Sequence, residues 1–329
     1  MKHMKFLSFF LGVTFSIVAC SSNNEIIPVP DVDPDGDDGT TEVEFAKGAD
    51  IGWVTEYESK GYNFYNAKGE QRECTALMKE LGLNAIRIRV WVDPSKHGNW
   101  GNTADVVEKA KRAKELGMDV MIDFHYSDWW ADPAQQNKPA SWVGKNLANL
   151  KSAIKDHTVS VLQALKTIGV IPKWVQVGNE IRPGMLWDED VALSGASYNV
   201  TEKDLKDAPA SATDKVVYPM NWANLGAFVT TGYDAVKSVF PDAIVIVHLD
   251  NGWDSGLFTW FFDELKKNGG KWDMIGMSLY PYWSRDAKEG YSSADAVITD
   301  CISNIKALST KYNCDVMVVE TGMECAGDN

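Results

Sequence analysis

The chain has 329 residues, of which 45% are hydrophobic and 24% charged, so it can build one large domain or two small ones. Its formal net charge of −14 argues against nucleic acid or an anionic membrane surface as a partner, and it fits a neutral or basic ligand. The composition includes 13 tryptophans, which suits either a large core or a cleft that stacks aromatic faces on sugar rings.

Residues 1–20 are typical of a signal peptide rather than of a folded domain. Two lysines precede an apolar run at residues 6–19, which is short for a membrane span, and an alanine precedes Cys20. This pattern resembles a bacterial lipoprotein signal, in which the cysteine becomes the lipidated first residue; an ordinary secretory signal is the alternative. We expect an exported lipoprotein of a Gram-negative bacterium, attached to the outer membrane through Cys20, at the cell surface or facing the periplasm.

Residues 21–44 are predicted to form an acidic flexible linker. The segment is rich in Ser, Asn, Pro, Asp and Gly, and its like charges repel one another. The acidic run at residues 31–38 also suggests calcium, but the full twelve-residue pattern of an EF-hand loop is absent. The linker is therefore the preferred interpretation, and a single catalytic domain is expected over residues 45–329.

Four cysteines follow Cys20, and an exported protein permits disulfides between them. Four cysteines allow three pairings, and the sequence does not choose among these. Their spacing does not match a zinc site. The four are Cys74, Cys301, Cys314 and Cys325.

From residue 45 onward, segments with strand and helix periodicity alternate, and the strands are apolar, which predicts a parallel sheet. Glycines at 82, 117 and 169 mark the ends of the first three helices. The predicted strands are residues 45–53, 84–91, 119–126, 174–180, 243–250, 274–281 and 315–322. The predicted helices are residues 74–81, 104–116, 147–168, 222–240, 259–268 and 294–312.

The alternation predicts a (β/α)8 TIM barrel in preference to an open doubly wound sheet. The glycine-rich phosphate-binding motifs of nucleotide-binding open sheets are absent, and nearly every strand ends in a polar or aromatic residue, as expected around one central site. Only seven strands are visible, whereas the barrel needs eight. We therefore expect that the eighth strand and the last helix are missing because the chain is truncated at its C-terminus; a lost eighth strand is the alternative.

Two strand ends deliver a glutamate after a long apolar run, at Glu180 and Glu320. A lone glutamate after a strand is usually a solvated loop residue. Two carboxylates at the carboxyl ends of parallel strands, however, are the groups that cleave glycosidic bonds. Each neighbouring polar residue has an ordinary structural interpretation, but together they would surround the two carboxylates: Arg87, Arg89, Asp123, His125, Asn179, His248, Asp250 and Tyr280.

At these motifs the chain resembles the endo-β-1,4-galactanases of glycoside hydrolase family 53, over about residues 48–322. Members of that family are retaining (β/α)8 hydrolases that carry an acid/base glutamate on strand four and a nucleophilic glutamate on strand seven, and Glu180 and Glu320 fill these positions. The chain departs from the family pattern because the eighth strand, which usually supplies an aromatic platform under the sugar, is missing. The matching segments are residues 84–92, 123–133, 176–187, 246–253, 278–283 and 318–321.

The resemblance implies hydrolysis of β-1,4-galactan side chains of pectic arabinogalactan in two steps. Arg87 and Tyr280 would favour a charged Glu320, and Asn179 would bind the sugar 2-hydroxyl. His125 and His248 would hold the substrate and the carboxylates in place. Some of six tryptophans past strand ends would stack on galactose units, and the others would only pack: Trp91, Trp129, Trp130, Trp187, Trp253 and Trp283.

The expected partners are β-1,4-galactan and galacto-oligosaccharides, with no nucleic acid, and we expect a monomer. This chemistry requires no cofactor, although the resemblance allows a structural calcium ion near the seventh and eighth strands. A non-catalytic surface glycan-binding protein on the same barrel remains an alternative, against which the presence of both glutamates argues. Another retaining β-glycanase of the clan, such as a mannanase or cellulase, is a second alternative, against which residues 126–133 argue.

Overall fold

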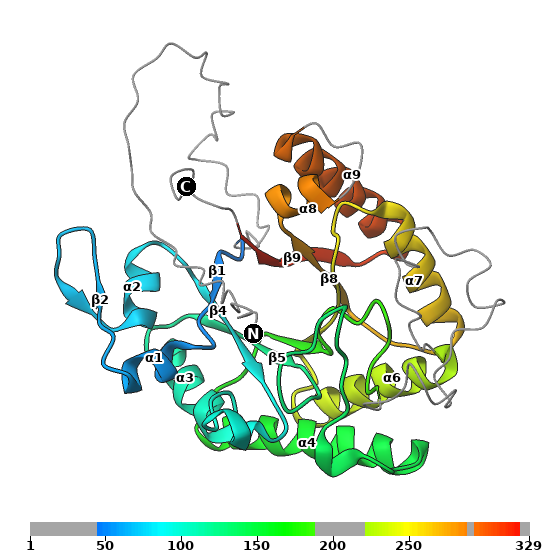
Figure 1. Cartoon of the computed structure of the whole chain (residues 1–329), viewed down its shortest axis with the longest axis horizontal. Helices are drawn as coiled ribbons and strands as arrows, with labels where there is room; N and C mark the ends of the chain where they lie inside the picture. The colour runs from blue at the N-terminus through cyan, green and yellow to red at the C-terminus, as the bar shows by residue number, and fades with distance from the viewer. Residues whose placement is uncertain (1–44, 188–220, 288–292, 323–329) are drawn as a thin grey trace, which may run out of the picture. The chain divides into compact units, whose positions relative to one another are not determined.

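A parallel sheet forms the centre of the computed structural model, which describes residues 45–187, 221–287 and 293–322 (Figure 1). Within these residues the sheet has seven strands in the order β1-β4-β5-β6-β7-β8-β9, and each pairs in parallel with the next. The prediction of a parallel barrel is confirmed. The strands are β1 Gly48–Asp50, β4 Ala85–Val90, β5 Asp119–Phe124, β6 Trp174–Val177, β7 Ile244–Leu249, β8 Met274–Leu279 and β9 Asp315–Thr321.

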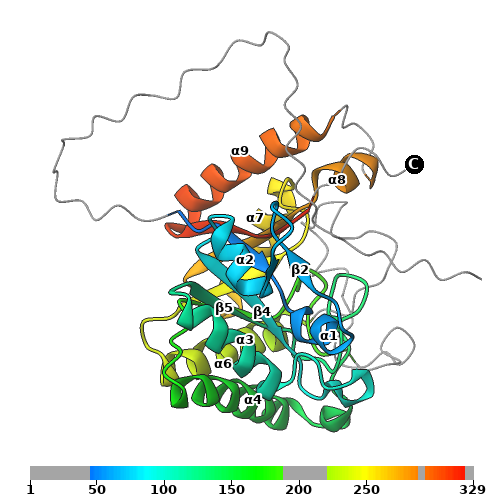
Figure 2. The same ribbon diagram turned by 90° about the vertical axis from the view of Figure 1, so that its left-hand side faces the viewer.

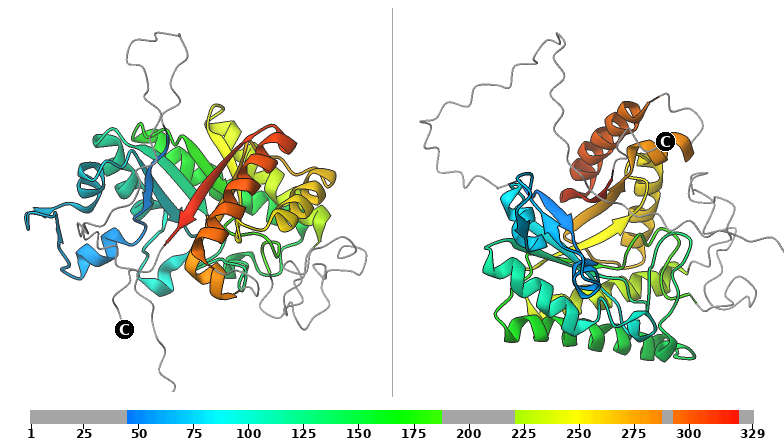
Figure 3. Two further views of the ribbon diagram at one scale, coloured as in Figure 1. Left: turned by 90° about the horizontal axis from the view of Figure 1, so that it is seen from above. Right: turned by 60° about the vertical axis from the view of Figure 1, so that its left-hand side comes forward.

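Helices connect successive strands and cover the outside of the curved sheet (Figure 3). Several begin at a residue whose side chain accepts a hydrogen bond from the first turn, as Asn102, Asn146 and Asp254 do. These caps satisfy backbone N–H groups that have no partner within the helix. The covering helices are α2 Cys74–Glu80, α3 Thr103–Glu115, α4 Leu147–Thr167, α6 Trp222–Val239, α7 Ser255–Lys267 and α9 Ala294–Tyr312.

The sequence pattern missed the short elements in the connections. The predicted first strand, residues 45–53, is only three residues long, because the chain turns after Asp50 into helix α1. Figure 2 shows α1, α2 and the small hairpin of β2 and β3 on the side facing the viewer. The missed elements are α1 Val54–Ser59, β2 Phe64–Tyr65, β3 Gln71–Arg72, the 3-10 helices η1 Pro94–His97 and η2 Ala140–Trp142, and α8 Pro281–Ala287.

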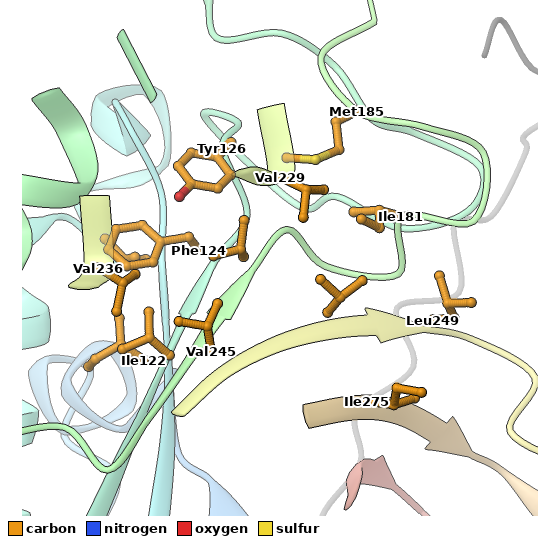
Figure 4. Close-up of a cluster of buried hydrophobic side chains, with 14 of the residues drawn as sticks. Ile122, Phe124, Tyr126, Ile181, Met185, Val229, Val236, Val245, Leu249 and Ile275 are labelled. Carbon is orange, nitrogen blue, oxygen red and sulfur yellow. The ribbon is translucent and has the colours of Figure 1, made fainter. Parts of the chain in front are cut away.

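The main hydrophobic core lies between the outer face of the sheet and the helices. Ile122 and Phe124 of β5 and Val245 of β7 belong to one buried cluster with Val229 and Val236 of α6 (Figure 4). Burial of each such side chain contributes about 1.5–3 kcal/mol. Because alternate strand residues face this core, the residues between them must face the barrel interior.

A second, smaller apolar cluster fills the barrel interior at one end. Its members come from alternate positions on neighbouring strands, so they form a floor beneath the carboxyl ends of the strands. Any polar side chain placed further along the same strand face stands above this floor. The floor consists of Ala85, Met121, Trp174, Ile246 and Met274.

Several predictions concern residues outside the described part of the chain. The chain divides into two units, Met1–Glu44 and Phe45–Asn329. The signal peptide at 1–20 and the linker at 21–44 therefore stay predictions. The same holds for the missing eighth strand and last helix, which concern the chain beyond residue 322.

The structure bears on disulfide bonds and on membrane-spanning helices in the described part of the chain. Cys74, Cys301 and Cys314 are free thiols, so no disulfide joins them, and Cys325 lies outside the described residues. None of the helices in the described part of the chain combines the length and the apolar composition that a membrane crossing requires.

Candidate active site

Polar side chains stand directly above the apolar floor inside the barrel. On β4, Arg87 follows Ala85 on the same face, and on β5 Asp123 follows Met121 in the same way. The next three strands repeat the pattern, with one polar residue each, so that the interior changes from apolar to polar along these five strands. These residues are Gln176 on β6, His248 on β7 and Ser278 on β8.

Glu180 and Glu320 lie beside each other at this end of the barrel. A carboxylate oxygen of each glutamate and a ring nitrogen of His248 all lie within 4.8 Å of one another. Glu180 has a φ of 47° and Gly178 a φ of 81°. A positive φ is uncommon outside glycine and is typical of functional sites, and here it occurs at the residue that presents the carboxylate.

A β-bulge places Glu320. Met317 and Val319 of β9 pack against the floor, so simple alternation would turn Glu320 away from the interior. The pairing of β8 with β9 shifts between Met277 and Ser278, and as a result Ser278 lies opposite Glu320. The extra residue on β9 turns the glutamate into the barrel, which is a known use of bulges next to active sites.

The surroundings of Glu180 favour its protonated form. Burial raises the pKa of Glu180 well above its ordinary value, and the negative charges of Glu320 and Asp250 raise it further. Ser278 Oγ donates a hydrogen bond to Glu180 Oε1 at 2.5 Å, which opposes part of this rise in pKa. The environment of Glu180 therefore favours the form that carries a proton.

Glu320 has a different environment, because two donors face its carboxylate. Tyr280 Oη donates to Glu320 Oε1 at 2.8 Å, and Arg87 Nη2 lies 3.4 Å from Oε2. Burial and the charge of Glu320 raise the pKa of Tyr280, so the phenol keeps its proton and remains a donor. Both contacts stabilise a negative charge on Glu320.

Arg87 connects this carboxylate to the rest of the polar layer. Its Nη1 donates to Asp50 Oδ2 at 3.0 Å, and its Nη2 donates to Asn179 Oδ1 at 2.9 Å and forms an ion pair with Asp123 Oδ2 at 2.9 Å. Nη2 also donates to Gln176 Oε1 at 3.2 Å. With a side chain only 8% exposed, Arg87 is held between several strands and cannot move without breaking this network.

Three of the predicted substrate-binding residues lie beneath the accessible site. Asp123 and His248 are completely buried, and His125 is 3% exposed. His125 Nε2 donates to Asp123 Oδ2 at 3.0 Å, and its Nδ1 accepts from the N–H of Ala131 at 3.0 Å. Because these groups use their polar atoms on other protein groups, they support the site from below, and their contact with substrate stays a prediction.

Asn179 and Asp250 also direct their polar atoms into the protein. Asn179 is 4% exposed, and its Nδ2 donates to the carbonyl oxygen of Ala131 at 2.7 Å. Asp250 accepts two bonds from Arg182 Nε, at 2.9 and 3.2 Å. Burial raises the pKa of Asp250 although Arg182 opposes the rise. Contact of these two residues with substrate stays a prediction.

The predicted aromatic residues separate into packed and accessible ones. Trp91 is 3% exposed and stacks on Trp129 with ring centroids 4.5 Å apart. The guanidinium of Arg89 lies 4.1 Å from the ring centroid of Trp130, which is 40% exposed, and Trp283 is 71% exposed. Trp130 and Trp283 are therefore accessible to a ligand, whereas two others of the predicted set are buried: Trp187 and Trp253.

Four residues that the sequence reasoning missed complete the polar layer. Gln176 and Ser278 are single polar residues within apolar strands, and this was a usable signal because each faces the interior. Asp50 pairs with Arg87 and Arg89, and Arg182 pairs with Asp250. The sequence around Asp50 and Arg182 does not reveal these partners, because the partners are distant in the chain.

One cluster in the described part of the chain has the dimensions of a metal site, and it consists of Glu180, His248 and Glu320. Both ring nitrogens of His248 already have hydrogen-bond partners, so the imidazole has no free lone pair to offer. We therefore treat the cluster as an acid–base site. The calcium ion that the resemblance allows stays a prediction, because most of the chain after Glu320 lies outside the described residues.

A parallel barrel with two neighbouring carboxylates above its floor defines the class of protein: this chain is a glycoside hydrolase of the (β/α)8 type. The family model described as "Glycosyl hydrolase family 53" matches residues 46–329, and the chain belongs to that family.

Three relatives illustrate the similarity. An arabinogalactan endo-β-1,4-galactanase of Thermothelomyces thermophilus is 32% identical over 281 residues, covering 84% of this chain and 73% of the relative. A solved fungal β-1,4-galactanase shares 31% identity with a TM-score of 0.68, covering 84% of this chain and 73% of its own. The family 53 catalytic domain of Ignisphaera aggregans shares 28% identity with a TM-score of 0.71, covering 92% and 72%. The family expected from the sequence motifs is thus confirmed.

Proposed function

We propose that the protein is a retaining endo-β-1,4-galactanase in which Glu320 is the nucleophile and Glu180 the acid/base. The separation of the two carboxylates carries the proposal. Retaining enzymes hold their carboxyl groups about 5–5.5 Å apart, whereas inverting enzymes keep about 6.5–9.5 Å for a water molecule. Glu180 and Glu320 have oxygens within 4.8 Å of each other, which supports retention.

In the first step, Glu320 attacks the anomeric carbon while Glu180 donates its proton to the leaving glycosidic oxygen. The anomeric carbon–oxygen bond breaks, and a bond to the Glu320 carboxylate forms. Tyr280 and Arg87 support the charged nucleophile through their contacts with its two oxygens. The raised pKa of Glu180 favours the protonated acid that this step requires.

In the second step, Glu180 acts as a base. It takes a proton from water, the water oxygen bonds the anomeric carbon, and the ester to Glu320 breaks. Once Glu320 carries the sugar it has lost its negative charge. One of the groups that raise the pKa of Glu180 is then gone, which suits the change of role from acid to base.

The substrate assignment rests on the relatives that carry galactanase names and on the accessible aromatic faces. The relatives' names specify β-1,4-galactan. Trp130 and Trp283 offer faces of the kind that stack on pyranose rings, and the net charge of −14 suits a neutral polysaccharide. We propose β-1,4-galactan side chains and their oligosaccharides as substrate, cleaved internally by a monomer that needs no cofactor.

We also propose that the enzyme is a lipoprotein anchored to the outer membrane through Cys20. The apolar run of residues 6–19 before that cysteine supports the proposal. The acidic segment of residues 21–44 would then act as the tether between the anchor and the catalytic domain.

The test is hydrolysis of β-1,4-galactan, with chromatography of the products and proton NMR of the first anomer released. Mixed short oligosaccharides with the β-anomer appearing first are expected, since two inversions give net retention. The α-anomer appearing first would refute the two-step mechanism. Binding of galactan without cleavage would favour a glycan-binding protein, and cleavage of mannan or cellulose in place of galactan would favour another β-glycanase.

A further inference from the structure

A row of hydrogen bonds crosses three strands and ends on Glu180. Gln176 Nε2 lies 3.1 Å from His248 Nδ1, and His248 Nε2 lies 2.8 Å from Ser278 Oγ. Ser278 Oγ lies 2.5 Å from Glu180 Oε1. The first two residues are completely buried and Ser278 is 2% exposed, so the row is built into the barrel interior and is not a surface contact.

Charged residues at the far end fix the orientation of the Gln176 amide. Asp123 Oδ1 lies 2.6 Å from Gln176 Nε2, and Arg87 Nη2 lies 3.2 Å from Gln176 Oε1. A carboxylate can only accept, and a guanidinium can only donate. The amide NH2 must therefore face Asp123, and on that same side it faces His248.

This orientation determines which ring nitrogen of His248 carries hydrogen. Burial, together with the positive charge of Arg87, lowers the pKa of His248 well below its ordinary value, so the ring is neutral with one N–H. The NH2 of Gln176 lies 3.1 Å from Nδ1, from the carbonyl oxygen of Gly178 and from Asn179 Oδ1, and we infer that Nδ1 accepts one of its two hydrogens. The hydrogen is then on Nε2, which donates to Ser278 Oγ.

In the other tautomer of His248 the hydrogen would be on Nδ1, which would donate it to Asn179 Oδ1 at 3.1 Å. That hydrogen would lie against the NH2 of Gln176, and Asn179 Oδ1 already accepts from Arg87 Nη2 at 2.9 Å. Because Ser278 Oγ accepts from His248, its own hydroxyl hydrogen is free to be donated to Glu180 Oε1.

We propose that Ser278 is a positioning residue for the acid/base: its hydroxyl occupies Glu180 Oε1, so that Oε2 carries the proton that is transferred. The proposal rests on the proposed role of Glu180. In the first step the Oε2–H bond breaks and a bond from hydrogen to the leaving oxygen forms. In the second step water returns a proton to Oε2, and Ser278 keeps its own proton throughout.

The neighbours of Glu180 explain what the loss of this hydroxyl would do. Glu320 from β9, Asp250 from the end of β7 and Asp132 from the loop after β5 are negative, and all of them raise the pKa of Glu180. The hydroxyl of Ser278 lowers it. Without the hydroxyl, the pKa of Glu180 should rise further, because the hydrogen bond that favours the charged form is lost.

The experiment compares Ser278→Ala with the wild-type chain on β-1,4-galactan and on an aryl β-galactobioside with an activated leaving group, across pH. We expect the alkaline limb of kcat/KM on galactan to move to higher pH. We expect kcat on galactan to fall on the order of tenfold, because the proton is no longer held on Oε2. The aryl substrate, which needs little protonation, should change much less.

Two variants serve as controls. Ser278→Thr retains a hydroxyl and should restore the pH profile. Thr158→Val removes another completely buried hydroxyl, one that bonds Tyr126 away from both glutamates, and should leave the pH profile unchanged. An unmoved alkaline limb in Ser278→Ala, or equal losses on both substrates, would overturn the positioning role.

Glu180→Gln, measured in the same assay, separates this inference from the proposed function. If Glu180→Gln hydrolyses galactan at the wild-type rate, the proposed function fails. If Glu180→Gln is impaired and Ser278→Ala shows no shift, only the positioning role fails. Nitrogen-15 NMR of labelled histidine in the wild-type protein gives a test that does not depend on folding of a variant. It should show hydrogen on Nε2 of His248, and hydrogen on Nδ1 would overturn the inference.

Discussion

Asp50→Asn isolates the contribution of a charge that the sequence reasoning overlooked. Asp50 Oδ2 lies 3.0 Å from Arg87 Nη1, and Oδ1 lies 3.3 Å from Arg89 Nη1. Asparagine has nearly the same shape, so packing is conserved. The substitution removes the negative charge and turns one acceptor into an NH2 group that faces the guanidinium groups.

The expected loss of stability in Asp50→Asn follows from these contacts. A hydrogen bond to a charged group contributes about 1.5–3 kcal/mol, and one amide oxygen remains to accept. Asp50 is 23% exposed at its side chain, whereas Arg87 keeps its bond to the buried Asp123. We therefore expect Asp50→Asn to lower the free energy of unfolding by about 2–4 kcal/mol. For a domain of this size, this corresponds to a fall in Tm of roughly 3–7 °C.

The assay is thermal and urea unfolding followed by circular dichroism, with Asp119→Asn as the matched control. Asp119 pairs with Lys173 at 2.6 Å, but both side chains are more than 40% exposed, so its loss should cost less than about 1 kcal/mol. If Asp50→Asn destabilises the protein no more than Asp119→Asn does, the pairing of Asp50 with the two arginines does not stabilise the barrel.

The difference in free energy of unfolding between the wild type and Asp50→Asn should depend on pH. Burial alone would raise the pKa of Asp50, but the charges of Arg89 and Arg87 outweigh it and hold this pKa below its usual range. A lowered folded-state pKa means that the stabilisation is present above the unfolded pKa of about 3.9 and is lost as pH falls through the folded value. The gap between wild type and Asp50→Asn should therefore be constant from pH 7 to 5 and close only below about pH 4. A gap that closes between pH 7 and 5 would refute this reasoning.

Three further substitutions test the catalytic and targeting roles. Glu320→Ala should abolish hydrolysis of both galactan and activated aryl galactobiosides, because no nucleophile remains; substantial aryl activity would contradict the assignment. Glu180→Ala should lose galactan hydrolysis but still release the aryl leaving group in a first burst, and equal loss on both substrates in stopped-flow measurements would count against an acid/base role. Cys20→Ala should move the protein from the membrane to the soluble fraction on centrifugation, and a variant that stays in the membrane pellet would exclude lipid attachment at this residue.

Local sequence signals were sufficient for the framework of the fold. Apolar β-branched runs alternate with helical periods, and glycines at 82, 117 and 169, all with positive φ, follow the ends of α2, α3 and α4 as expected. Shorter elements escaped prediction because two or three residues carry no periodicity. The hairpin of β2 and β3 and the helix α1 are examples.

The sequence by itself determined the barrel, its family and the two glutamates at strand ends, because these depend on residue patterns within single segments. The tertiary structure decided what each polar residue does. A bulge in β9 turns Glu320 inward, and contacts between distant strands bury His248 and make Ser278 a partner of Glu180. These features depend on register and on contacts between side chains far apart in the chain, such as Ser278 and Glu180, which are 98 positions apart, and no local pattern records such distances.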